Sequence, residues 1–271
     1  MEERIISLKK DGVRTINLRK DQKKEGEDLK YIYCGLRWEP ALIKEHMVRG
    51  TSHIEQQIEY TGNFFQRLFK TGPVKVTDIE VEDSKGYIVP SKELDIDLDA
   101  SIVMFDENKV EYDLVYYGHQ RSDDGSISSL LGDDTTGRSK GCGEDNELIR
   151  IELEKVSPRI KYMTIILNIY QHSGRDEKTL VFDHIPSASM NIYSSDVKVD
   201  SSTKINQLRM FAEYKIDNNT DFIGKRALVL GTFIRVGKGN SWKFTASGIM
   251  TGEKCIRDMI NGSVKRALTE L

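Results

Sequence analysis

The sequence predicts a mainly β protein, a β-sandwich interrupted by one internal helix and closed by a C-terminal helix. Three observations support this prediction. Eleven short runs rich in Val, Ile, Tyr and Phe are bounded by Gly, Asp, Asn or Ser, as strands of a sandwich or barrel are. Near residues 53–70 the apolar spacing changes to that of a helix, and the chain ends in an amphipathic stretch.

The predicted strands are short and fairly evenly spaced along the chain. In order they read RIISL, RTINL, KYIYCGLRW, DASIVMFD, YDLVYYG, LIRIEL, YMTIILNIY, ASMNIYS, RMFAEYKI, ALVLGTFIRV and WKFTASG. The segment VGKGNSW, between the last two runs, contains two glycines and an asparagine. Such residues are typical of a hairpin connection, so we expect these two strands to pair.

The predicted internal helix begins with a capping box, in which Ser52 is followed three residues later by Glu55. Gly72 and Pro73 supply the stop signal. Between them the apolar residues recur at helical spacing: Ile54, Ile58, Phe65, Leu68 and Phe69. We interpret this apolar face as core packing, and the alternative is an interaction surface for a partner.

The C-terminal stretch from Glu253 carries an apolar stripe on one helical face. Its members are Ile256, Met259, Ile260, Val264, Ala267 and Leu268. We expect this helix to pack against a sheet.

Composition narrows the class of protein. Apolar residues make up 38% of the 271 residues and charged residues 31%, which is typical of a soluble globular protein. The net charge of −3 gives no global basic field, so we expect no nucleic-acid partner. The three scattered cysteines and the lack of a signal-peptide pattern favour a reducing, cytoplasmic location.

Two acidic segments stand out. In ELDIDLDAS, Asp95, Asp97 and Asp99 alternate with apolar residues, so a strand would project the three carboxylates from one face at intervals of roughly 7 Å. The glycine-rich loop GDDTTGRSKGCGEDNE, residues 132–147, holds five more. These are Asp133, Asp134, Glu144, Asp145 and Glu147.

Carboxylates and backbone carbonyls are the hard oxygen ligands that Ca²⁺ prefers, whereas zinc favours Cys and His. The EF-hand spacing is absent. The alternative is a solvated acidic loop, because Asp and Gly are ordinary turn residues. Asp123 and Asp124 lie in another turn, which either faces the same end of the sandwich or is a plain Asp-Gly turn.

The order of these motifs resembles the TerD family, the calcium-binding tellurium-resistance and general stress proteins. The matching stretches, in the same order, are SLKKDGVRTINL, YCGLRW, DLDASIVMFD, GDDTTG, DNE and SWKFTASG, from Ile5 to about Gly248. Three features depart from the family pattern. Asp134 replaces the usual asparagine, Asn146 replaces an acidic residue, and the loop is longer and includes Arg138 and Lys140.

The resemblance implies a single TerD-like domain over residues 1–271, with a family-atypical insertion at 40–92 that carries the helix near 53–70. It also implies calcium binding by the acidic loops. The implied ligands are the carboxylates of Asp97, Asp99, Asp133, Asp134, Asp145 and Glu147, and the carbonyls of Thr136 and Gly137.

By the same resemblance, the expected function is that of a calcium-binding, non-enzymatic protein of a stress or tellurium-resistance response. It would scaffold a complex of protein partners at or near a membrane. One alternative is an adaptor that binds a partner or small ligand through the helical insertion, since long connections often carry function. A further alternative is a calcium-assisted hydrolase, although no nucleophile elbow or phosphate loop is present.

Overall fold

The computed structural model describes residues 6–7, 15–17, 30–43, 46–48, 52–60, 73–82, 87–89, 92–138, 145–170, 180–200, 208–216, 223–237 and 239–271. The chain divides into two compact units. One comprises Met1–Leu42 with Glu93–Leu271, and the other comprises Ile43–Lys92. The acidic segments belong to the first unit.

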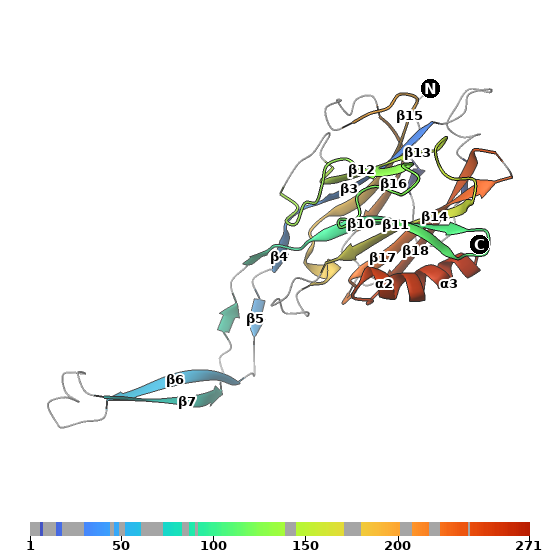
Figure 1. Ribbon diagram of the computed structural model, residues 1–271. Coiled ribbons are helices and arrows are strands. Elements are labelled where there is room, and N and C mark those ends of the chain that lie inside the picture. The colour runs from blue at the N-terminus through green and yellow to red at the C-terminus, as the bar shows by residue number, and fades with distance from the viewer. Residues whose placement is uncertain are drawn as a thin grey trace. The chain divides into compact units, whose positions relative to one another are not determined.

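The described part of the first unit contains two six-stranded sheets (Figure 1). All strand pairs are antiparallel except the parallel pair β1 and β16. In spatial order the first sheet contains β1 (Ile6–Ser7), β16 (Arg209–Ile216), β15 (Ala188–Ser195), β3 (Tyr31–Trp38), β13 (Glu147–Glu152) and β12 (Ile127–Ser129). The second contains β11 (Glu111–Val115), β10 (Leu98–Asp106), β14 (Ile160–Ile169), β17 (Ala227–Val236), β18 (Ser241–Thr251) and β2 (Thr15–Asn17).

Each of the eleven predicted strands overlaps one of these elements, so the mainly β prediction is confirmed. The predicted hairpin is also present, because β17 pairs with β18. Its turn contains Gly237 at a φ of +67°, a conformation that glycine adopts without strain. The sequence analysis missed the three-residue strand β12, which is too short to show an alternating pattern.

The main core lies between the two sheets. Alternate residues of each strand point into it, such as Cys34 and Leu36 from β3 and Ile102 and Met104 from β10, all 0% exposed. Burial of this apolar surface is the main force that holds the two sheets together. Between β14 and β15, a short 3₁₀ turn, η3 (Phe182–His184), adds Phe182 to the same core.

A second core explains why β10 contains the unbroken apolar run IVMF, residues 102–105. Val103 and Phe105 point to the opposite face of the sheet, where they pack with Met259, Val264 and Leu268 of the C-terminal helical stretch. That stretch runs through α2 (Ile256–Met259), a π-helical turn η6 (Ile260–Val264) and α3 (Lys265–Thr269). The predicted apolar stripe is therefore confirmed, and it covers the outer face of the second sheet (Figure 1).

A buried arginine connects the tip of the β17–β18 hairpin to the start of β14. The Arg235 guanidinium lies 4.4 Å over the Trp242 ring and is 5% exposed. It donates hydrogen bonds of 2.8–3.2 Å to five acceptors. These are the carbonyls of Ile160, Val156, Ser157 and Gly239, and the side-chain oxygen of Asn240.

Glu152, at the end of β13, is a buried carboxylate surrounded by three cations. Its oxygens lie 2.7 Å from Lys198 Nζ, 2.9 Å from Lys155 Nζ and 3.1 Å from Arg150 Nη2. Burial alone would raise the pKa of Glu152, but the two lysine hydrogen bonds and the Arg150 charge outweigh it and lower the pKa below its ordinary value.

We expect Glu152→Gln to reduce the free energy of unfolding by about 1–2 kcal/mol at pH 7 and by less at pH 4, which lies below the ordinary pKa of a glutamate. A carboxyl group whose pKa is lowered by folding stabilises the protein above its unfolded pKa, and this contribution is lost as the pH falls through the folded pKa. Urea unfolding at both pH values measures the difference. The exposed neighbour Glu154, changed to Gln, is the control. An equal loss at both pH values would contradict the prediction.

The second unit contains antiparallel strand pairs. β5 (His46–Val48) pairs with β8 (Tyr87–Val89), and β6 (Ser52–Tyr60) pairs with β7 (Val74–Glu82) over nine residues each. At its boundary with the first unit, β4 (Ala41–Ile43) pairs with β9 (Lys92–Leu94).

The predicted helix near 53–70 is wrong over its first part, because residues 52–60 form strand β6. Its second part, 61–70, lies outside the described residues. A spacing of four residues, as between Ile54 and Ile58, puts two side chains on one face in a helix and also in a strand. The segment forms a strand because it pairs with β7, whose sequence VKVTDIEVE is rich in β-branched residues. The described part of this insertion therefore contains strands, and no helix.

Among the described residues, no helix is both long enough and apolar enough to cross a membrane.

Candidate metal centre

The acidic segment DIDLD leads directly into β10. Asp97 immediately precedes the strand, where its carbonyl accepts a 2.8 Å hydrogen bond from the Tyr170 amide, and Asp99 is its second residue. Asp99 lies opposite Asn168 of β14. Both aspartates are buried, at 3% and 1% exposed. The predicted alternation is confirmed for Asp97 and Asp99, because the intervening Leu98 enters the main core. It does not extend to Asp95, which precedes the strand, is exposed and pairs with Arg138 at 2.6 Å.

The loop after β12 brings a third carboxylate to this pair. Asp133 is exposed, and one oxygen from each of Asp97, Asp99 and Asp133 lies within 4.8 Å of the other two. The structure therefore brings together three of the side chains that the sequence analysis named as metal ligands. The first two are neighbours in sequence, and the third joins them only through the fold.

Glu147 adds a fourth acidic group beside these three. It begins β13 in the other sheet, is 5% exposed, and its Oε2 accepts a 2.9 Å hydrogen bond from the Ala100 amide of β10. Glu147 therefore links the two sheets at the acidic end of the sandwich.

Without a bound cation, the ionised carboxylates of this group repel one another. Burial and the neighbouring charges of Asp97 and Asp133 raise the pKa of Asp99 to about 8. Burial, followed by the Asp99 charge, also raises the pKa of Glu147 well above its ordinary value. Full charges at such separations repel by roughly 3 kcal/mol per pair at an effective dielectric constant near 20.

The residues present fit a hard divalent cation. The donors are carboxylate oxygens, which Ca²⁺ and Mg²⁺ prefer over the Cys and His donors typical of zinc. Asp99 Oδ2 is buried and accepts no hydrogen bond from any residue that the structure describes. Ionising a buried carboxyl group that lacks a donor is costly, and a bound cation would remove that cost.

Asp134, the next acidic residue of the loop, folds the loop back on itself. Its Oδ1 accepts hydrogen bonds from the Thr136 and Gly137 amides and the Thr136 hydroxyl, at 3.0–3.1 Å. Its Oδ2 accepts a 2.8 Å bond from the Asn146 side chain, whose own oxygen accepts a 3.0 Å bond from the Trp38 amide. Metal ligation by Asp134, and by the carbonyls of Thr136 and Gly137, stays a prediction.

Asp145 makes its observed side-chain contacts within the first sheet. Its oxygens accept a 2.7 Å hydrogen bond from the Tyr193 hydroxyl and a 2.9 Å bond from the Asn191 amide. It also lies tightly against Gly35, where a side chain would collide with it. Burial, together with the Asp145 charge, raises the pKa of Tyr193. Metal ligation by Asp145 stays a prediction, and these contacts show it bound to protein donors.

Comparison with known proteins places this acidic end in a defined family. Residues 74–261, more than half of the chain, match the TerD domain. The chain belongs to the TerD family. Three of the matching motifs, DLDAS, GDDTTG and DNE, lie inside this range, and they carry the acidic residues described above.

One curated relative is the stress response protein SCP2 of Bacillus subtilis (strain 168). It is 30% identical over 168 residues, which cover 61% of this chain and 74% of that protein. Among similar solved structures is a protein of unknown function, with a TM-score of 0.49 and 14% sequence identity. The match covers 86% of this chain and 95% of that one. Another is a homologue of a telluride resistance protein (TerD) from Streptomyces coelicolor A3(2), with a TM-score of 0.48 and 16% identity, and the match covers 85% of this chain and 95% of that one.

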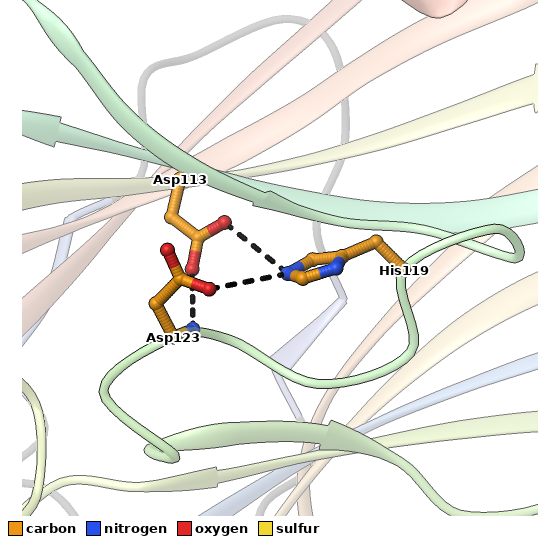
Figure 2. A group of neighbouring side chains, drawn as sticks. All are labelled: Asp113, His119 and Asp123. Atoms are coloured by element: carbon orange, nitrogen blue, oxygen red, sulfur yellow. Dashed lines mark hydrogen bonds and ion pairs between the residues drawn. The ribbon is translucent and has the colours of Figure 1, made fainter.

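A second group of potential ligands occurs elsewhere in the TerD domain, at the β11 end of the second sheet. His119 Nε2 lies 3.5 Å from Asp113 Oδ1 and 3.9 Å from Asp123 Oδ1 (Figure 2). The His119 and Asp123 side chains are 42% and 82% exposed, so water screens the charges of this group. The sequence analysis missed it, because the fold rather than sequence spacing joins its members.

The neighbouring Asp124 is held in the turn. Its oxygens accept hydrogen bonds from Ser122, Ser126 and Ser157. The turn contains Gly125 at a φ of +69°. Asp123 and Asp124 are therefore turn residues, and neither belongs to the group formed by Asp97, Asp99 and Asp133.

We expect Gly137→Ala to reduce the free energy of unfolding of the TerD domain by about 2–3 kcal/mol. Gly137 has a φ of +73°, and a Cβ there would lie 2.5 Å from Trp38 Nε1. Gly132 has a φ of +81° in the same loop but open space around it, so Gly132→Ala measures the backbone strain alone. Equal losses for the two variants in urea unfolding would show that the Trp38 contact contributes nothing.

Proposed function

We propose that this chain is a calcium-binding, non-enzymatic protein of a stress or tellurium-resistance response that scaffolds a complex of protein partners. The observation that carries the proposal is the convergence of Asp97, Asp99 and Asp133 within 4.8 Å, with two of the three buried. Membership of the TerD family and similarity to a stress response protein support the cellular context.

In this proposal Asp97, Asp99 and Asp133 supply ligands, and Glu147 supplies further negative charge beside them. Bound calcium contributes positive charge and takes six to eight oxygen ligands, so loop carbonyls and water complete the set. The chain's own part is to position the carboxylates. The Tyr170 amide fixes the backbone at Asp97, and the four hydrogen bonds to the Asp134 side chain shape the loop that presents Asp133.

Binding would tie the loop after β12 to the start of β10. This couples ion binding to the shape of one end of the sandwich, because an ion held only by the folded state stabilises that state. A surface ordered in this way is suited to partner binding that depends on calcium. We place the scaffolded complex of protein partners at or near a membrane as part of this proposal.

Isothermal titration calorimetry of the metal-free full-length chain tests the metal site. We expect saturable calcium binding that Asp99→Asn weakens at least tenfold, and weaker binding of magnesium, whose strict octahedral geometry suits a broad carboxylate group less well. The control Asp123→Asn changes an aspartate of the group in Figure 2 and leaves the affinity unchanged. No binding at millimolar calcium, or an unchanged affinity in Asp99→Asn, refutes the site.

A second candidate function is an adaptor that binds a partner through the Ile43–Lys92 unit. The supporting observation is that Val74 and Val76 of β7 are 53% and 50% exposed, on a two-stranded ladder in a compact unit of its own. Replacing both valines by lysine in the full chain tests it. If the variant no longer captures a partner that the parent captures equally well with and without chelator, the adaptor is favoured. If chelator abolishes capture and the variant retains it, calcium-dependent scaffolding is favoured.

A hydrolase would require turnover that depends on the same carboxylates. The non-enzymatic proposal therefore predicts no calcium-dependent ester or glycoside hydrolysis that Asp133→Asn abolishes. Such an activity, measured with purified protein, would replace the binding proposal by a catalytic one.

A further inference from the structure

The group formed by Asp113, His119 and Asp123 differs in chemistry from the proposed calcium centre, because it contains an imidazole. One ligand atom from each of the three side chains lies within 4.8 Å of the other two (Figure 2). A nitrogen donor beside two carboxylates suits a first-row transition dication such as zinc, whereas calcium takes six to eight oxygen ligands. The two carboxylates also balance the charge of one dication.

The distances within this group are longer than hydrogen bonds and close to those between two ligands of one metal ion. His119 Nε2 lies 3.5 Å from Asp113 Oδ1 and 3.9 Å from Asp123 Oδ1, whereas N–H···O bonds are about 2.7–3.2 Å long. Two ligands of a tetrahedral zinc ion lie roughly 3.3 Å apart, because each metal–ligand bond is about 2.0–2.1 Å. The Asp123 side chain is 82% exposed, so it is free to rotate toward an ion.

Asp113 is the ligand that the fold holds in place. Its side chain is 9% exposed, and its two oxygens accept 2.7 Å hydrogen bonds from the Leu114 and Asp123 amides. Each carboxylate oxygen has two lone pairs, so Oδ1 can bind an ion and keep its bond to Leu114. Hydrogen bonds of this kind orient the carboxylates that ligate metals. The bond from the Asp123 amide also brings the second carboxylate beside the first.

His119 is placed by the turn that follows β11. Tyr116 and His119 exchange backbone hydrogen bonds of 3.1 and 2.9 Å, which fixes the backbone from which the imidazole projects. The His119 side chain is 42% exposed, so an ion can reach Nε2 from solvent. Water can fill the fourth tetrahedral position, as it does at zinc sites with three protein ligands.

We propose that Asp113, His119 and Asp123 bind a divalent cation of the zinc type, through His119 Nε2 and one oxygen from each aspartate. The site does not depend on the proposed calcium centre, and it goes beyond calcium-dependent scaffolding. A bound ion ties β11 to the turn that contains Asp123. The alternative is an exposed ion pair of protonated His119 with the two aspartates, which stabilises the fold little and binds no metal.

The test is calorimetric titration of the full-length protein with zinc chloride in excess calcium, which keeps the calcium centre occupied. We expect saturable zinc binding that His119→Ala and Asp123→Asn each weaken at least tenfold. Both side chains are exposed, so neither variant is expected to lower the melting temperature measured without zinc. Absence of saturable zinc binding by the parent, or equal zinc affinity of the parent and His119→Ala, overturns the proposal.

Two further measurements separate this site from other zinc donors. Cys255 is an exposed free cysteine, and Cys255→Ser is expected to keep the zinc affinity of the parent. In nitrogen-15 spectra of the imidazoles, zinc is expected to move His119 Nε2 more than any nitrogen of the other four histidines. Loss of zinc binding in Cys255→Ser but not in His119→Ala, or an unmoved His119 signal at saturating zinc, overturns the proposal.

Discussion

Calcium at about one hundred times its dissociation constant is expected to raise the melting temperature of this protein by about 5–10 °C, and Asp99→Asn is expected to abolish most of the rise. Saturation to that degree stabilises the folded state by about 2.7 kcal/mol, and a domain of this size gains roughly 2–4 °C per kcal/mol. Scanning calorimetry in calcium, in magnesium and in chelator measures the effect.

The same variant is expected to behave in the opposite way without metal. In chelator, Asp99→Asn removes one of the mutually repelling carboxylates from a buried position, so its melting temperature is expected to equal or exceed that of the parent. The order of the two proteins therefore reverses between chelator and calcium. A merely structural role for Asp99 would lower the melting temperature in both conditions.

The matched control for this experiment is Asp123→Asn. It also removes one aspartate from a group of potential metal ligands, but that group is the exposed one in Figure 2. We expect its calcium-induced shift to match that of the parent. If it lost the shift while Asp99→Asn retained it, calcium would bind at His119 and its neighbours, and the proposed centre would be wrong.

Arg235→Ala is expected to destabilise the protein by about 3–5 kcal/mol, the largest effect predicted for any single substitution. The change removes five hydrogen bonds and leaves four buried or partly buried carbonyls without their donor. It also removes the cation that lies over Trp242. Urea unfolding with both near-ultraviolet and far-ultraviolet detection measures the loss.

Arg159→Ala is the control for this substitution. Arg159 also lies over an aromatic ring, at 5.3 Å from the Tyr112 centroid, but it is exposed. We expect it to cost about 1 kcal/mol or less. A loss for Arg235→Ala no greater than that for Arg159→Ala would show that the hydrogen bonds to the hairpin contribute little net stability.

The strands and the C-terminal helix were predictable because their patterns depend on local geometry. Each predicted strand carries β-branched or aromatic residues between turn residues, and the stripe from Ile256 to Leu268 has helical spacing over a long enough stretch. Asp97 and Asp99 were predictable as a pair for the same reason, since alternation in a strand places both on one face.

The prediction of a helix near 53–70 was wrong over residues 52–60 because local signals there fit two structures. Ser52 and Glu55 satisfy a capping box, and Ile54 and Ile58 suit either period. The strand forms because residues 74–82 pair with this segment, and that contact involves residues far enough away in sequence to lie outside any local window.

The sequence by itself determined the mainly β character, the C-terminal helix and the supply of carboxylates, because composition and residue spacing fix which local conformations are favourable. Only the tertiary structure decided which carboxylates meet. It joined Asp133 to Asp97 and Asp99, and turned Asp145 toward Tyr193. It also buried Asn168 Oδ1, opposite Asp99 in the β10–β14 register, without a hydrogen bond from any described residue. These outcomes depend on strand pairing and packing between distant segments, whose free energies no local pattern contains.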